Sequence, residues 1–259
     1  MIEEPYRWVE AVANRREYIE TQLASGSPIA AVACRDGILF VTLGATRQKV
    51  FEIYDRIAMG AIGHPGDIER LRMAAIELAS AEGFTRSAAD VSLRRLAYYS
   101  LSPMLKAAFE QIYGAPYLAR LLFAEIGDRP ENDLILRVDY DGAIASNGAM
   151  RAGARQDFGV LSGSSVSADL MESYLKQEHD SAAPLTTALK TALNATSVGH
   201  MAVGESGIRA LPTKDALNAE REKQASGATV EAALLERASS SAIRFRVLSS
   251  EEITASLGV

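Results

Sequence analysis

Two continuous apolar runs on either side of an Asp-Gly turn constrain the fold of this chain more than any other feature. The runs cover residues 29–34 and 38–42, and Asp36-Gly37 lies between them. Asp-Gly is a strong signal for a β-hairpin turn. Because neither run alternates with polar residues, both faces of the resulting sheet must be covered. The sequence therefore predicts a layered fold with this hairpin inside it.

The order of the remaining elements indicates which layers cover the hairpin. A second hairpin is expected at 49–53 and 56–60, and helical stretches follow the apolar spacing at 68–82 and 93–112. Further strands are predicted at 117–126, 133–140, 158–163, 230–236 and 243–247, and further helices at 166–178, 184–195 and 251–257. Hairpins and helix pairs in this order predict an α+β fold, a four-layer α/β/β/α sandwich of two antiparallel sheets flanked by helix pairs.

Local signals predict where several helices begin and end. An extra amphipathic helix at 5–24 starts at Pro5, and the next helix is expected to be capped by Asp67 and to end before Gly83. Pro103 should kink or divide the helical stretch in which it lies. We expect a single domain over 1–259. Its polar excursion at 197–228 is long enough for local mobility, with a short helix at 213–224.

Charge and composition exclude several classes of function. The chain has 27 Lys and Arg against 33 Asp and Glu, a net charge of −6, which gives no electrostatic case for nucleic-acid binding. No window is apolar enough for a membrane span, and the acidic N-terminus lacks the features of a secretory signal. The single cysteine, Cys34, suits a reducing compartment. We therefore expect a cytoplasmic protein.

Motifs for cofactor, metal and serine-triad chemistry are missing from the sequence. No glycine loop of the phosphate-binding kind and no G-x-S-x-G elbow occurs. The histidines, His64, His179 and His200, are far apart in the chain, and none has a partner at metal-ligand spacing. We expect neither a cofactor nor a metal.

Three segments resemble a known family. Residues 26–40 look like the first hairpin of proteasome α-type subunits, and residues 49–63 look like their lysine-led second hairpin, which ends in a glycine. Residues 136–142 are similar to a later strand with its Asp-Gly turn. The bacterial, actinobacterial-like α subunit matches best, over residues 5–195 and 229–257. The resemblance implies the N-terminal nucleophile hydrolase fold, which is the same four-layer sandwich.

The family has two kinds of subunit, and the resemblance leaves a choice between them. Catalytic β-type subunits use an N-terminal threonine with a lysine and an acidic residue. Here Ser27 and Lys49 stand at the threonine and lysine positions, so cleavage before Ser27 would leave a self-compartmentalising peptidase of the same fold. However, Leu43 occupies the acidic position, and an internal Ser27 has no free amine. We therefore favour the non-catalytic α type.

An α-type reading implies a set of partners and one docking pocket. Copies of the chain, by resemblance seven, would form outer rings that stack on catalytic β subunits and gate the entry of unfolded proteins. Lys49 would pair with the C-terminal carboxylate of an ATPase ring activator, and Gly63 and His64 would line the same pocket. Without the resemblance, Lys49 reads as a solvated lysine at a strand end. A divergent scaffold without activator or catalytic partner stays a weaker alternative.

The N-terminal segment would supply the gate and part of the ring contacts. By resemblance, the first residues lie near the axial pore, and the helix after them contacts the next subunit. Trp8 could equally pack within its own subunit. The residues implied are Met1, Ile2, Glu3, Glu4 and Pro5 at the gate, and Tyr6, Trp8 and Val9 at the ring contact.

Overall fold

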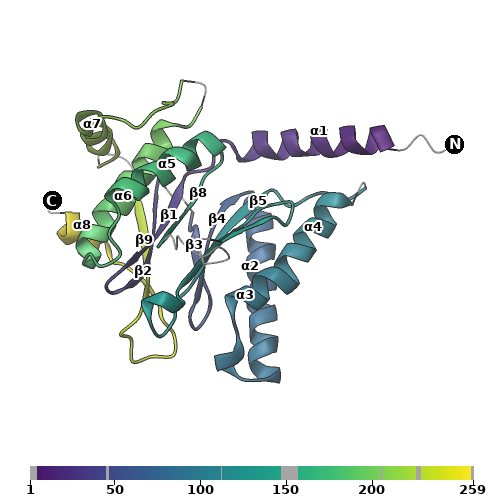
Figure 1. Ribbon diagram of the computed structural model, residues 1–259, viewed down its shortest axis with the longest axis horizontal. Coiled ribbons are helices and arrows are strands. Elements are labelled where there is room, and N and C mark those ends of the chain that lie inside the picture. Colours follow the sequence, from purple (N-terminus) through teal and green to yellow (C-terminus); the bar gives the residue numbers. More distant parts are fainter. Residues whose placement is uncertain are drawn as a thin grey trace.

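The computed structural model describes residues 5–44, 47–111, 113–146, 157–204, 206–225 and 229–257. Within them, two five-stranded antiparallel sheets pack face to face (Figure 1). The first has the order β10-β9-β2-β1-β8, from β1 (Ile29–Cys34), β2 (Gly37–Leu43), β8 (Phe158–Leu161), β9 (Val230–Glu236) and β10 (Phe245–Val247). The second has the order β3-β4-β5-β6-β7, from β3 (Val50–Tyr54), β4 (Ile57–Gly63), β5 (Ala119–Glu125), β6 (Leu134–Val138) and β7 (Ile144–Ser146).

Helices cover the outer face of each sheet, which confirms the predicted four-layer sandwich. The second sheet is covered by α2 (Pro65–Thr85), α3 (Leu93–Leu96), a π-helical turn η2 (Ala97–Leu101) and α4 (Ser102–Glu110). The first sheet is covered by α5 (Ser165–Glu178), α6 (Leu185–Met201) and α8 (Ser250–Leu257). Two short 3-10 turns, η1 (Ala88–Asp90) and η3 (Pro130–Asn132), lie in the connections.

Three apolar layers hold the sandwich together. Ile29, Phe40 and Leu235 belong to the layer between the two sheets and are fully buried. The side chains that alternate with them, such as Val41, face α5 and α6 instead. The continuous apolar runs therefore arise because both faces of β1 and β2 are covered, as the sequence predicted.

The start of α2 corrects the predicted cap. His64 is the N-cap, its Nδ1 accepts a hydrogen bond from the Gly66 backbone amide at 3.2 Å, and Pro65 is the first helical residue. Asp67 lies within the helix and accepts from the Leu118 amide at 3.0 Å. The prediction of Asp67 as cap was wrong because proline at the first position starts the helix three residues earlier.

Of two further predictions about the helices, the one for Gly83 was wrong and the one for Pro103 is confirmed. Gly83 does not follow the end of α2 but lies inside it, where an added Cβ would come within 2.2 Å of the Tyr54 hydroxyl. The glycine there permits close packing rather than ending the helix. The helical stretch that contains Pro103 is divided as expected, since the π-helical turn ends at Leu101 and α4 begins at Ser102 with Pro103 as its second residue.

The N-terminal helix α1 (Pro5–Leu23) is held by its C-terminal half. Ile19 and Leu23 are buried with Phe109 and Tyr140. The Arg15 guanidinium donates to the carbonyl oxygens of residues 109, 111 and 114 at 2.7–3.0 Å. The first turns of α1 project beyond the sandwich (Figure 1).

The polar excursion contains a helix that packs on α6. α6 runs to Met201, past its predicted end at 195, and α7 (Lys214–Ala225) forms where a short helix was expected. Leu217 is buried under α7, and Ser197 Oγ lies 2.7 Å from Gln224 Oε1. Residues 226–228 of the excursion lie outside the described residues.

Candidate functional site

A cavity of about 450 Å³ opens where the segment before β1, the start of β3, the end of β4 and the start of α2 meet. Lys49 and Gly63, two of the predicted pocket residues, both line it. Its wall combines a cationic side with apolar groups. The lining residues are Ser25, Gly26, Ser27, Gly44, Arg47, Gln48, Lys49, Phe51, Ala61, Ile62, Gly63, Pro65, Ile68 and Glu69.

Lys49 directly precedes β3 and is partly buried in this wall. Its carbonyl oxygen accepts a hydrogen bond from the Ala61 amide of β4 at 2.9 Å. Burial lowers the pKa of its ammonium group, and the nearby carboxylate of Glu231 acts in the opposite direction. Lys49 is therefore a partly desolvated cation on a cavity wall, the kind of group that gains most from an incoming anion.

Sequence reasoning missed Glu231, which lies behind the cationic wall. Its carboxylate accepts hydrogen bonds from the backbone amides of Lys49, at 3.0 and 3.1 Å, and Val50, at 2.9 Å. Burial raises the pKa of this carboxyl, and the two backbone amides lower it. One signal was available, because Glu231 is the charged residue near the start of the otherwise apolar run 230–235.

Gly63 is required at its position by geometry. Its φ is +132°, and an added Cβ would lie 2.0 Å from the Leu118 carbonyl oxygen, because the backbone of β5 passes against it. The adjacent His64 is exposed, and its imidazole caps α2 rather than joining the described residues that line the cavity. The structure thus brings Lys49 and Gly63 together and places His64 at the helix start beside them.

The serine of the catalytic alternative also lies on this cavity, but the alternative lacks an acid. Ser27 and Lys49 share the wall, as the alignment with catalytic subunits predicted. The Leu43 side chain belongs to the layer under α5 and α6, so it presents neither a carboxylate nor a free face to the cavity. The carboxylate among the described lining residues, Glu69, accepts hydrogen bonds from Nε and Nη2 of Arg72 at 2.8 and 2.7 Å.

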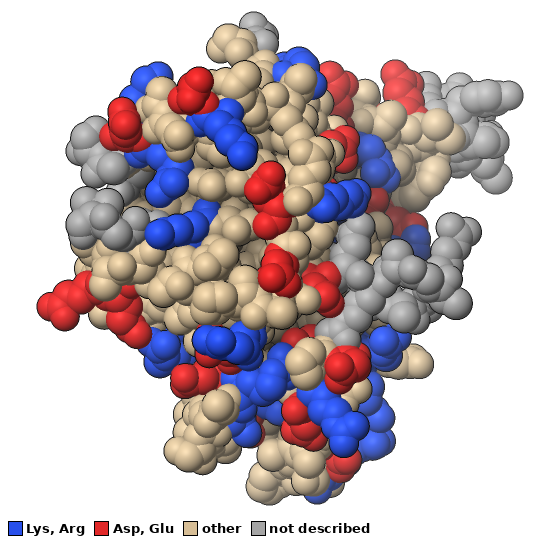
Figure 2. Space-filling view, turned by 60° about the vertical axis from the view of Figure 1, so that its left-hand side comes forward, with Lys and Arg blue, Asp and Glu red and all other residues tan. Residues whose placement is uncertain are grey.

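The predicted gate and ring-contact residues lie at or before the start of α1. Trp8 is 40% exposed and Val9 is 66% exposed on the projecting part of α1, whereas Met1, Ile2, Glu3 and Glu4 lie outside the described residues, as does the side chain of Tyr6. In the described ranges no group of three or more acidic, His or Cys side chains is arranged to hold a metal ion. None of the described helices has the length and apolar character needed to cross a membrane. Acidic and basic side chains are interspersed over the face in Figure 2.

Comparison with known proteins shows which family this geometry belongs to. The family model described as "Proteasome subunit" matches residues 23–196. A proteasome subunit alpha of Nocardioides sp. (strain ATCC BAA-499 / JS614) is 34% identical over 208 residues, 80% of this chain and 75% of the relative. Another, of Streptomyces coelicolor, is 34% identical over 191 residues, 73% of this chain and 70% of the relative.

The names of these relatives decide between the two subunit types. Both are α subunits of actinobacteria, so the preference for the α type over a catalytic subunit is confirmed, and this chain is not itself the peptidase. The absence of an acid at Leu43 agrees with that assignment. The chain therefore belongs to the proteasome subunit family, as a non-catalytic subunit of the α type.

Proposed function

We propose that copies of this chain form the outer rings of a cytoplasmic proteasome core particle, gate the entry of unfolded proteins and dock a ring-shaped ATPase. The observation that carries the docking role is the shared cavity of Lys49 and Gly63, with a partly buried cation beside an apolar wall. A peptide C-terminus matches both parts, since its carboxylate would pair with the ammonium and its last side chains would pack on the wall. Such a charge-assisted contact is worth about 1.5–3 kcal/mol, and repetition around a ring multiplies it.

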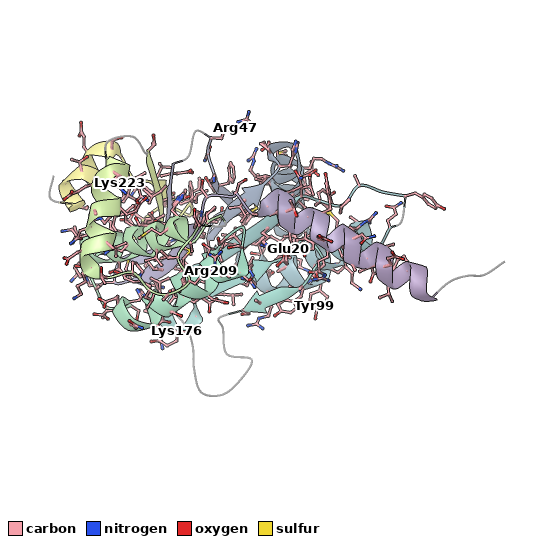
Figure 3. All side chains as sticks on the ribbon, turned by 90° about the horizontal axis from the view of Figure 1, so that it is seen from above. Glu20, Arg47, Tyr99, Lys176, Arg209 and Lys223 are labelled. Atoms are coloured by element: carbon pink, nitrogen blue, oxygen red, sulfur yellow. The ribbon has the colours of Figure 1, made fainter. Side chains whose placement is uncertain are left out.

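Lys49→Ala tests the docking role in the assembled particle. Rings reconstituted with their catalytic β partner should hydrolyse short peptides normally but lose most of the ATPase-stimulated degradation of an unfolded protein. Lys176→Ala is the matched control, because Lys176 is exposed on α5 and lies on the opposite side of the sandwich from Arg47 of the cavity wall (Figure 3). Unchanged stimulation in the Lys49→Ala particle would remove the docking role.

The gating role depends on the N-terminal residues. We expect deletion of residues 1–5 to raise the basal rate of peptide hydrolysis by the assembled particle, because the deletion widens the entrance without touching the catalytic subunits. The matched control is a particle in which the same five residues are replaced by a flexible Gly-Ser segment of equal length. If both particles hydrolyse peptides at the native rate, the segment is not the gate.

Ring assembly gives the exposed part of α1 a role. Trp8 and Val9 leave apolar surface exposed near the start of α1, where Trp8 also lines a small pocket with Phe109 and Glu110 of α4. A ring contact requires two different faces that fit one another, and this helix end supplies one of them. Trp8→Ser together with Val9→Ser should shift the particle to smaller species in analytical ultracentrifugation. A full-sized particle from the double variant would exclude α1 from the contact.

A further inference from the structure

Glu231 connects the two sheets at the cavity. It lies on β9 of the first sheet, opposite Thr42 of β2, and its side chain reaches the start of β3 in the second sheet. There the carboxylate accepts hydrogen bonds from the backbone amides of two successive residues, Lys49 and Val50. The Lys49 carbonyl oxygen accepts a hydrogen bond from the Ala61 amide, so both the amide and the carbonyl of this lysine are held by hydrogen bonds.

Hydrogen bonding alone does not require a charged group at this position. A glutamine could accept a backbone amide with less desolvation than a carboxylate, whose burial is costly. Burial acts against both charges here, since it raises the pKa of Glu231 and lowers that of Lys49. Each charge partly offsets the cost of the other, so the geometry and the electrostatics support the same pairing.

The other charged groups around Lys49 do not replace Glu231. His200 on α6 has its pKa lowered, first by burial and also by the positive field of Lys49. Glu69 on α2 is engaged by Arg72, and Arg47 is a second cation on the same wall. Glu231 is the group whose charge favours the protonated form of Lys49.

We propose that Glu231 is the positioning residue of this docking site, whose carboxylate fixes the Lys49 backbone at the cavity wall so that the lysine is held in place for an incoming peptide carboxylate. This inference deepens the proposed docking function and rests on it. Glu231 does not contact the incoming carboxylate. It acts through Lys49, and its effect must therefore appear in how Lys49 titrates.

The first experiment measures that titration without any ligand. Lys49 in the assembled particle is labelled with a trace of acetic anhydride across a pH series, and the modified peptide is quantified by mass spectrometry. Glu231→Gln should lower the pH midpoint of Lys49 labelling, by on the order of one pH unit. Glu231→Asp keeps the charge and should leave the midpoint closer to the native value. Glu236→Gln, at the far end of β9, should leave it unchanged.

The second experiment measures docking with a defined probe, a fluorescein-labelled octapeptide of Ala and Ser that ends in Leu, with a free carboxylate or a C-terminal amide. The native particle should prefer the free carboxylate, and Glu231→Gln should weaken that form about fivefold at neutral pH, which is about 1 kcal/mol. The amide form should bind both particles equally.

The outcomes separate the two claims. An unchanged labelling midpoint in Glu231→Gln, with native thermal stability, overturns the positioning role whatever the peptide does. A lowered midpoint together with a native particle that does not distinguish carboxylate from amide supports the link between Glu231 and Lys49 and overturns the docking function. A lowered midpoint with weakened carboxylate binding supports both.

Discussion

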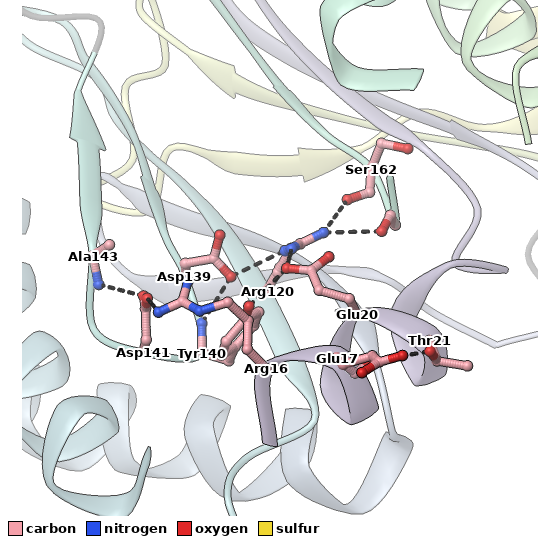
Figure 4. A network of polar contacts seen from close by, with 11 residues as sticks. Arg16, Glu17, Glu20, Thr21, Arg120, Asp139, Tyr140, Asp141, Ala143 and Ser162 are labelled. Atoms are coloured by element: carbon pink, nitrogen blue, oxygen red, sulfur yellow. Dashed lines mark hydrogen bonds and ion pairs between the residues drawn. The ribbon is translucent and has the colours of Figure 1, made fainter. Parts of the chain in front are cut away.

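Glu20 on α1 and Arg120 on β5 form an ion pair that attaches the N-terminal helix to the sandwich (Figure 4). The Glu20 carboxylate also accepts a hydrogen bond from the Tyr140 hydroxyl at 2.7 Å. The Arg120 guanidinium donates further to Asp139 at 3.0 Å and to the carbonyl oxygens of Ser162 and Gly163 at 3.2 and 3.0 Å. One buried guanidinium therefore joins α1 to both sheets.

Replacing Arg120 should loosen α1 and destabilise the fold. Arg120→Met leaves Glu20 and Asp139 without their cation, and breaking a buried pair in this way costs about 3 kcal/mol, the lower end of the usual range because Glu20 is 41% exposed. Urea denaturation of the isolated subunit measures the free energy of unfolding. Arg16→Met is the matched control on the same helix, since Arg16 is 52% exposed and its pair with Asp141 is worth at most about 1 kcal/mol. Equal losses in the two variants would contradict a special role for Arg120.

Substituting Gly63 should distort the cavity. Gly63→Ala forces a Cβ to within 2.0 Å of the Leu118 carbonyl at a φ of +132°, so the strand must shift, and we expect a loss of about 3 kcal/mol. Gly44 also lines the cavity and has a φ of +73°, but no atom lies within 4 Å of its added Cβ. Gly44→Ala should therefore cost about 1 kcal/mol, from backbone strain alone. Thermal unfolding compares the two, and an equal shift in Tm would show that the close approach of β5 is unimportant.

Asp133, which directly precedes β6, and Arg237, which directly follows β9, should stabilise the sandwich by joining its two sheets. The Arg237 guanidinium binds both Asp133 carboxylate oxygens at 2.6 and 3.0 Å, and the Asp133 side chain is 2% exposed. Asp133→Asn leaves this arginine with a neutral partner, and we expect a loss of about 3 kcal/mol in urea denaturation. Asp128→Asn, in the exposed loop between β5 and β6, should change the free energy of unfolding by less than about 0.5 kcal/mol. A loss below about 1 kcal/mol for Asp133→Asn would contradict the pair's contribution.

Acid should destabilise the subunit through His179 and His200. Burial is the main cause that lowers the pKa of both imidazoles below the usual value of 6.5. As the pH falls, the unfolded chain therefore takes up protons before the folded one. The contribution of the neutral histidines to the free energy of unfolding is complete above pH 6.5 and is lost as the pH falls toward the folded pKa values. The loss is up to about 1.4 kcal/mol per histidine for each pH unit in that window. Urea denaturation at pH 7.5 and 5.5 should show the decrease, and His179→Leu should make it smaller. An identical decrease in this variant would contradict the role of His179.

The parts of the architecture that could be predicted from the sequence are those set by local patterns. The apolar runs at β1 and β2 and the Asp-Gly turn between them depend on neighbours in the chain, and the structure has the strands where these signals place them. The prediction of the α2 cap was wrong because Asp67 and His64 can both accept a backbone hydrogen bond. The choice depended on Pro65, which starts the helix, and on the segment entering β5, whose Leu118 amide donates to Asp67. The pocket residues Lys49 and Gly63 were found through family resemblance, since a lysine at a strand end has no distinctive pattern of its own.

The sequence by itself determined the order of strands and helices, the burial of the first hairpin on both faces and the attachment of an amphipathic helix before it. These properties follow from periodicity and turn chemistry, which act between residues close in the chain. Only the tertiary structure decided which polar groups meet. Glu231 accepts a hydrogen bond from the backbone of Lys49, which is 182 residues away in the sequence, and Glu20 forms an ion pair with Arg120, which is 100 residues away. A glutamate on a solvated edge and one buried against a partner look the same in sequence, because the partner is chosen by packing in space.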